Sequence, residues 1–282
     1  MADLRTLRLP VLTSPWRAAA SVLLGVAAVN LPFTLAAVVL MTDPPVTPGV
    51  LVRSLLVFSA LPAAAGWSLL RLFRTALHAR PGAIALERPG LDVTVPCRAV
   101  AEIEPWRLPL PRPGLAVRLR SGERLPYGIC GDPLDALDVL AEAEIDVAGA
   151  RTHPTVVYAR ERARRARFGW RRLLLKFVVF GVVPTAILFN AHQHIAYGGT
   201  FGQYYLYGPS AYFETLAIYW LLTVLHLVLF ASLWRGLAEV GALSAAWIAP
   251  ASAGPARQAA EVACAALYYG GVPLLLLYRF LS

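Results

Sequence analysis

The stretch AAASVLLGVAAVNLPFTLAAVVLM, residues 18–41, decides the class of this protein. Its 24 residues carry no charge, and about 20 apolar residues in a helix are what crossing a bilayer requires. Arg5, Arg8 and Arg17 precede it. A secretory signal peptide has a shorter apolar core and is followed by a small-residue cleavage site, so we interpret this segment as an uncleaved membrane anchor.

Four more apolar segments indicate further spans, at about 51–72, 173–189, 213–234 and 259–278. Successive prolines between Thr42 and Gly49 cannot continue a helix, so the first two spans form a hairpin. The composition agrees, because 57% of the residues are hydrophobic and only 15% are charged. We therefore predict an α-helical integral membrane protein with about five transmembrane helices and a small cytoplasmic α+β domain.

The distribution of arginine predicts the orientation, because short positively charged loops stay in the cytoplasm. Eighteen arginines lie from Arg71 to Arg172, whereas the connections at 41–51 and 191–211 contain none. We expect a bacterial inner-membrane protein with a cytoplasmic N-terminus, a cytoplasmic central block and a cytoplasmic loop at 235–257. Five spans place the C-terminus in the periplasm, and a re-entrant fifth span would return it to the cytoplasm.

From Ala83 to about Ile129 the central block changes from continuous apolar runs to short alternating segments, a pattern typical of antiparallel strands. Segments 83–86 and 91–95 flank Glu87-Arg88-Pro89-Gly90, which predicts a hairpin. Further strands are predicted at 99–106, 115–120 and 124–129. Asp132-Pro133 predicts the start of a helix that reaches about Ile145, with aspartate as N-cap and proline at the first helical position.

This order of elements, with the acidic-apolar segment 101–106, the hairpin at 115–124 and the terminal Asp-Pro helix, resembles bacterial pleckstrin-homology-like (PH-like) domains. The resemblance covers about residues 80–146. It implies a half-open barrel with a capping helix and a role in binding or assembly. The Leu108–Pro113 insertion departs from the short turn expected there. We interpret it as a surface loop or as a stiff extended segment that contacts a partner.

The predicted organisation is a transmembrane hairpin at 1–73, the PH-like domain at 74–150, a basic juxtamembrane segment at 151–172 and a three-helix transmembrane region at 173–282. A helix at 159–168 in the basic segment would align arginines on one face and attract anionic lipid headgroups. A plain topology signal is the alternative. The candidate membrane-surface residues are Arg160, Arg162, Arg164, Arg165, Arg167, Arg171 and Arg172.

The outer loop contains the candidate metal ligands His192 and His194, with Glu214 close to the start of the next span. Two histidines two residues apart point to the same side only in an extended segment, so the metal site requires that backbone. An aromatic, uncharged loop also suits the headgroup region or a protein contact. The intramembrane polar residues Asn30 and His226 read as packing or interhelical hydrogen-bonding groups, Asn30 also as a cap for a carbonyl freed by Pro32.

Our leading hypothesis is a non-enzymatic protein for assembly, scaffolding or regulation of a membrane complex, which needs no cofactor. Its expected partners are the bilayer with its anionic headgroups and a membrane protein or a second copy, and no nucleic acid. The alternative is a membrane enzyme or transporter that uses the His192, His194 and Glu214 site for a metal or lipid. A lipid-handling protein is a third possibility. The three cysteines are too widely spaced for a disulfide framework.

Overall fold

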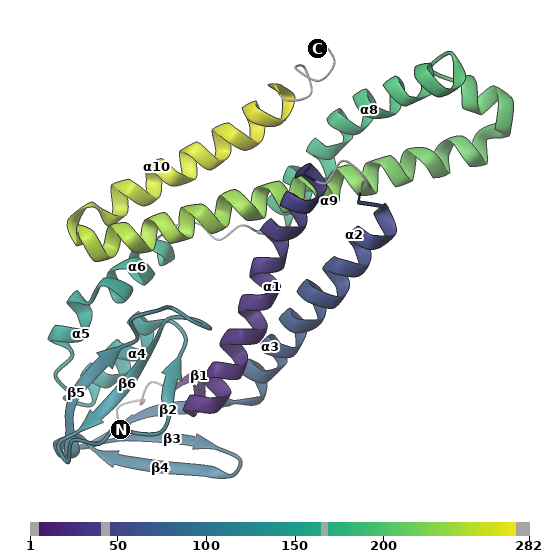
Figure 1. The fold of residues 1–282 in the computed structure, drawn as a ribbon. Helices are drawn as coiled ribbons and strands as arrows, with labels where there is room; N and C mark the ends of the chain where they lie inside the picture. Colours follow the sequence, from purple (N-terminus) through teal and green to yellow (C-terminus); the bar gives the residue numbers. More distant parts are fainter. Residues whose placement is uncertain (1–5, 41–45, 165–168, 275–282) are drawn as a thin grey trace. The chain divides into compact units, whose positions relative to one another are not determined.

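The computed structural model describes residues 6–40, 46–164 and 169–274, which form two compact units (Figure 1). The first unit is built from the described residues within 1–30, 54–165 and 239–258. The second unit is built from those within 31–53, 166–238 and 259–282. The first unit contains the whole β-sheet, and the second is helical.

The described residues form a sheet of seven antiparallel strands in the order β4-β3-β2-β1-β7-β6-β5. The strands are β1 Thr6–Leu12, β2 Arg74–Arg80, β3 Ala83–Arg88, β4 Leu91–Pro96, β5 Val100–Pro105, β6 Gly114–Leu119 and β7 Gly128–Cys130. The hairpin predicted around Pro89 and Gly90 is confirmed as β3 and β4, with Gly90 at a φ of 78°. Strands predicted at 99–106 and 115–120 are confirmed as β5 and β6, whereas the one predicted at 124–129 begins later, as β7.

Two strands carry no clear signal in the sequence, β1 and β2, and they pair with each other in the middle of the sheet. Pro10 lies opposite Arg74, and the backbone N–H of Val11 donates to the carbonyl of Phe73 at 2.9 Å. A single residue, Thr13, separates β1 from the first apolar helix. A single residue, Phe73, separates the second apolar helix from β2. The helical hairpin is therefore inserted between two paired central strands of the sheet.

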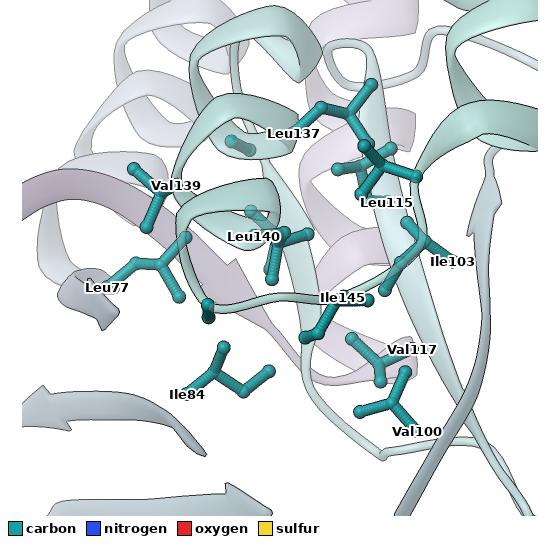
Figure 2. Close-up of a cluster of buried hydrophobic side chains, with 14 of the residues drawn as sticks. Leu77, Ile84, Val100, Ile103, Leu115, Val117, Leu137, Val139, Leu140 and Ile145 are labelled. Carbon is teal, nitrogen blue, oxygen red and sulfur yellow. The ribbon is translucent and has the colours of Figure 1, made fainter. Parts of the chain in front are cut away.

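Helix α4, Pro133–Glu142, packs against β1 and β2 and covers the core of the sheet. Asp132 is its N-cap, as predicted, and its carboxylate accepts from the N–H of Leu134 at 3.0 Å. Figure 2 shows α4 residues facing strand residues across this core. The buried members labelled there are Leu77, Ile84, Val100, Ile103, Leu115, Val117, Leu137, Val139, Leu140 and Ile145.

Within the described residues, four helices are long and apolar enough to cross a membrane by length and composition: Ser14–Leu40, Pro48–Leu72, Trp170–Tyr197 and Gly202–Ile248. The first is α1, and the last is α9, which contains a break at Gly208. The second comprises α2 Pro48–Leu55, η1 Leu56–Ala60 and α3 Leu61–Leu72, and the third comprises α7 Trp170–Leu173, η3 Leu174–Val179 and α8 Phe180–Tyr197. These four helices agree with a membrane protein.

The fourth span continues far beyond its predicted end at 234, because α9 is helical to Ile248. The prediction of a loop at 235–257 is therefore wrong for residues 235–248, which are helical. The turn lies at Ala249–Ser252, and α10, Ala253–Ala266, follows it and passes into η5, Leu267–Gly271. Helix α10 is not among the four described helices that are long and apolar enough to cross a membrane. Residues 275–278 of the predicted fifth span lie outside the described residues.

Candidate functional sites

The basic segment is not one continuous helix with an arginine face. Helix α6, Pro154–Ala163, carries Arg160 and Arg162 and is followed by Arg164, and the backbone of Gly169 is extended before α7 begins at Trp170. Arg171 and Arg172 belong to α7, whereas Arg165 and Arg167 lie outside the described residues. The extended glycine interrupts the register between Arg164 and Arg171 that a shared face requires.

Two of these arginines form hydrogen bonds to other residues of the first unit. Arg160 donates to the carbonyl of Arg151 at 3.2 Å, and Arg164 lies 2.6 Å from the carboxylate of Glu161. Helix α6 is also buried at Val156, Tyr158 and other residues. Arginine side chains in this segment thus help to hold α6 in place as well as to charge the surface.

Tyr158 of α6 belongs to a buried polar cluster that the sequence pattern did not reveal. Both terminal nitrogens of Arg257 contact the carboxylate of Glu239, Nη2 to Oε1 at 2.9 Å and Nη1 to Oε2 at 3.1 Å. The Tyr158 hydroxyl donates to the same carboxylate at 2.6 Å. Only 3% of the Arg257 surface is exposed. Burial, with the hydrogen bond to Glu239, raises the pKa of Tyr158, so its hydroxyl keeps its proton and acts as a donor.

The second unit does not provide the extended backbone that the predicted metal site requires. His192 and His194 lie on α8, so they point to different sides of a helix. His194 Nδ1 is 2.9 Å from the carbonyl of Asn190, and the His192 ring packs near Tyr219 with 5.1 Å between centroids. Among the residues that the structure describes, no three His, Cys, Asp or Glu side chains, Glu214 included, lie close enough to hold a metal.

Beside these histidines, a buried glutamine pair stabilises the start of α9 in the second unit. The Gln193 amide donates to the Gln203 side-chain oxygen at 2.7 Å, and the Gln203 amide donates to Thr215 Oγ1 at 2.9 Å. Gln193 is fully buried. An adjoining surface is apolar and strongly exposed: Ile195, Phe201, Tyr205, Leu206 and Tyr207, which we call the aromatic outer surface.

The two polar residues that lie within predicted spans, Asn30 and His226, are hydrogen-bonded. Asn30 of α1 donates to Ser59 Oγ at 2.9 Å and to the carbonyl of Ser54 at 3.3 Å, so it forms hydrogen bonds to residues of η1 and α2. His226 Nδ1 lies 2.6 Å from the carbonyl of Leu222, four residues earlier on its own helix. Neither contact requires a ligand.

A cleft of about 1080 Å³ lies within the first unit. One wall consists of the first turns of α1, from Ser14 to Val22. The other is formed by β5, the proline-rich segment after it and residues near β7, including Glu102, Arg107 and Arg124. The cleft combines charged side chains with apolar ones, among them Leu108 and Leu110.

The indole ring of Trp106 lines this cleft and packs closely against two glycines. A Cβ placed on Gly114 or on Gly128 would lie 2.7 Å from a carbon of the indole ring, so both positions must lack a side chain. The guanidinium carbon of Arg17 lies 4.4 Å from the ring centroid, within the range of cation–π attraction. Trp106 thereby connects the start of α1 to strands β6 and β7.

His153 also lines the cleft and caps α6. Its Nδ1 accepts from the N–H of Thr155 at 3.3 Å, and its ring packs edge-on against Trp247 at 5.4 Å between centroids. Burial, and then the positive charge of Arg107, lower the pKa of His153 below its ordinary value. The neutral imidazole is the form that can accept the capping hydrogen bond.

Trp106 and the Tyr158 cluster were missed because their partners are distant in sequence. Comparison of the chain with protein-family models, with curated proteins and with solved structures finds no match.

Proposed function

We propose that this chain is a non-enzymatic bacterial inner-membrane protein that serves the assembly, scaffolding or regulation of a membrane complex. It acts through a cytoplasmic PH-like module and through the aromatic outer surface. The observation that carries the proposal is the insertion of the helical hairpin between the paired strands β1 and β2. One residue separates strand from helix on each side, so the sheet cannot rotate freely relative to α1 and α3.

The assignment of a PH-like module is supported by the sheet and its helix. Seven antiparallel strands are closed by α4, which follows β7 and packs over the core, as the resemblance of residues 80–146 implies. Connections this short limit how far the module can turn relative to the two helices that it adjoins. That property suits a protein that positions a partner beside a membrane.

The aromatic outer surface supports a contact in or near the opposite headgroup layer. Tyr205 is 81% exposed and Ile195 is 86% exposed, while the glutamine pair keeps the segment beneath them ordered. Rigid aromatic side chains bury much area on binding and lose little conformational entropy. They therefore suit a membrane-protein partner or a second copy of this chain.

The sidedness can be tested with two single-cysteine positions. A membrane-impermeant maleimide applied to intact cells should label Ser210→Cys and leave Ser121→Cys unlabelled until the cells are opened. Ser121 is exposed in the turn after β6, and Ser210 is exposed near the start of α9. Labelling of Ser121→Cys from the periplasm would reverse the orientation and remove the proposed role of each face.

The partner contact can be tested by photo-crosslinking in the native membrane. A photoreactive phenylalanine at Tyr205 should give one discrete protein adduct, whereas the same residue at Val240, which is 64% exposed on α9, should not. Adducts with lipid alone at both positions would contradict the proposal. A stoichiometric transition metal in the purified protein, lost when His192 and His194 are both replaced by alanine, would support the enzyme or transporter instead.

A further inference from the structure

The cleft beside α1 is lined by two arginines that form no ion pair within the described part of the chain. The guanidinium groups of Arg17 and Arg107 have no carboxylate within 4 Å among the described residues. Arg124 differs, because it lies 2.7 Å from Glu104. Arg17 contacts the Trp106 ring, but neither it nor Arg107 has a carboxylate partner among the described residues. Two such guanidiniums lining one cleft favour a phosphate, whose oxygens accept charge-assisted hydrogen bonds from arginine.

The carboxylate of Glu102 in the same cleft favours a ligand that also carries a positive charge. Glu102 lines the cleft and forms no ion pair among the described residues. A purely anionic ligand would be repelled by this group, whereas a ligand that carries both a phosphate and a primary ammonium offers a group of opposite charge to each of the three side chains. The ammonium also donates hydrogen bonds to a carboxylate, which a quaternary ammonium cannot do.

The position of the cleft points to a lipid rather than a soluble phosphate. Its α1 wall consists of the first turns of a helix long and apolar enough to cross a membrane, so these turns lie at the headgroup level if α1 spans. Val22, Leu108 and Leu110 line the cleft and are 64%, 61% and 50% exposed. Exposed apolar side chains beside arginines match the boundary between phosphates and acyl chains.

We propose that this cleft binds the headgroup of phosphatidylethanolamine, with the phosphate at Arg17 and Arg107, the ammonium at Glu102, and the acyl chains beginning along Val22, Leu108 and Leu110. The inference rests on the proposed function only in placing α1 across the bilayer. The lipid fills the space between α1 and β5, so it contacts both the sheet and the apolar helix.

The test titrates the full chain, purified in a mild detergent, with dihexanoyl lipids while thermal unfolding is followed. Dihexanoyl-phosphatidylethanolamine should raise the Tm in a saturable manner, with an apparent Kd about tenfold lower than those of the phosphatidylcholine and phosphatidylglycerol analogues. Glycerophosphoethanolamine, which has the headgroup without acyl chains, should bind more weakly. Equal affinity for this soluble compound would overturn the assignment to a lipid.

Two variants separate the parts of the site. Arg107→Ala should weaken binding of all three lipids about tenfold, since one charge-assisted hydrogen-bonding group is lost. Glu102→Gln should remove the preference for phosphatidylethanolamine while it retains phosphate binding. Arg120→Ala is the matched control, because Arg120 is an exposed arginine in the turn after β6 and lies outside the cleft.

The inference is overturned if the three lipids give the same shift in wild type, if no shift saturates, or if Arg120→Ala weakens binding as much as Arg107→Ala. Both arginines are exposed, so the unliganded Tm of each variant should equal that of wild type and confirm that it folds. A chain that shows the proposed cysteine labelling and protein adduct but no lipid selectivity would refute this inference alone.

Discussion

Arg257 and Glu239 form a two-contact ion pair across 18 residues, between the end of α9 and the start of α10, with the arginine almost completely buried. In the sequence each has a potential partner four residues away, Arg235 for Glu239 and Glu261 for Arg257. The structure also pairs Arg235 with Glu261, at 3.8 Å. The two ion pairs recorded here therefore join different helices.

Replacement of Arg257 by alanine should destabilise the protein by about 3 kcal/mol, because it leaves the carboxylate of Glu239 partly buried without its cation. Arg235→Ala is the control, since that side chain is 44% exposed and its pair should contribute less than about 1 kcal/mol. Thermal unfolding of the detergent-solubilised chain measures both effects. Equal losses in the two variants would contradict a special role for the buried pair.

Alanine at Gly114 or Gly128 should destabilise the sheet by about 1–3 kcal/mol, because the added methyl collides with the Trp106 ring. At Gly114 the new Cβ would also lie 2.5 Å from the carbonyl oxygen of Ile129. Gly149→Ala on α5, Ala148–Thr152, is the matched control, because nothing lies within 4 Å of that position and alanine favours a helix. Unfolding midpoints should fall for the first two variants and not for the third. Unchanged midpoints throughout would mean that the indole is not held between these glycines.

The stability of the first unit should decrease as the pH falls below about 6.5, the ordinary pKa of histidine. The pKa of His153 is lowered in the folded state, so the unfolded chain binds a proton first and the equilibrium shifts toward unfolding. The loss stops once the pH is below the folded pKa, where both states are protonated. His153→Asn should keep the cap and remove this part of the pH dependence, and His153→Ala should also lose about 1 kcal/mol at pH 7. Melting curves from pH 5 to pH 8 test this, and an identical pH profile in His153→Asn would contradict it.

Asn30 and Ser59 should be energetically coupled, because the Asn30 amide donates to the Ser59 hydroxyl at 2.9 Å in an apolar surrounding. Asn30→Ala should cost about 1–2 kcal/mol, and a double-mutant cycle with Ser59→Ala should return a coupling of about 0.6 kcal/mol, as for other interhelical hydrogen bonds in membranes. Steric-trap or detergent unfolding measurements supply the four free energies. Additive losses would show that the two side chains do not interact.

Cys130 should react slowly with thiol reagents. Burial raises the pKa of this thiol to about 11, and the side chain is fully buried, so the thiolate is scarce and inaccessible at pH 8. Maleimide labelling followed by mass spectrometry should modify Ser121→Cys at least about tenfold faster than native Cys130. Comparable rates would show that the sheet opens around β7.

The sequence predicted those parts of the fold that depend on neighbouring residues. The apolar runs located four helices, since a span is a property of about 20 consecutive side chains. Asp132-Pro133 marked the start of α4, and Pro89-Gly90 marked the β3–β4 hairpin, because N-caps and tight turns are made by the residues themselves. The arginine distribution supplied an orientation that the Ser121 and Ser210 positions can test.

The sequence pattern could not show which segments, distant along the chain, are in contact in the folded protein. β1 pairs with β2 across an apolar hairpin of about 60 residues, and β1 resembles an ordinary flank of a membrane anchor. The predicted metal site failed for a related reason, since local composition did not distinguish a loop from the helix that carries His192 and His194. The glycines around Trp106 have no signature of their own, because their role depends on a ring more than seven residues away.

Residue order alone therefore determined where this protein is apolar, where it turns and where its positive charge collects. Tertiary structure decided that the N-terminal strand completes the sheet, that Glu239 binds Arg257, and that Arg17 and Arg107 line one cleft. The physical reason is range: helix formation, capping and membrane partitioning are summed over neighbouring residues, whereas strand register, buried ion pairs and binding clefts depend on which surfaces the folded chain brings together.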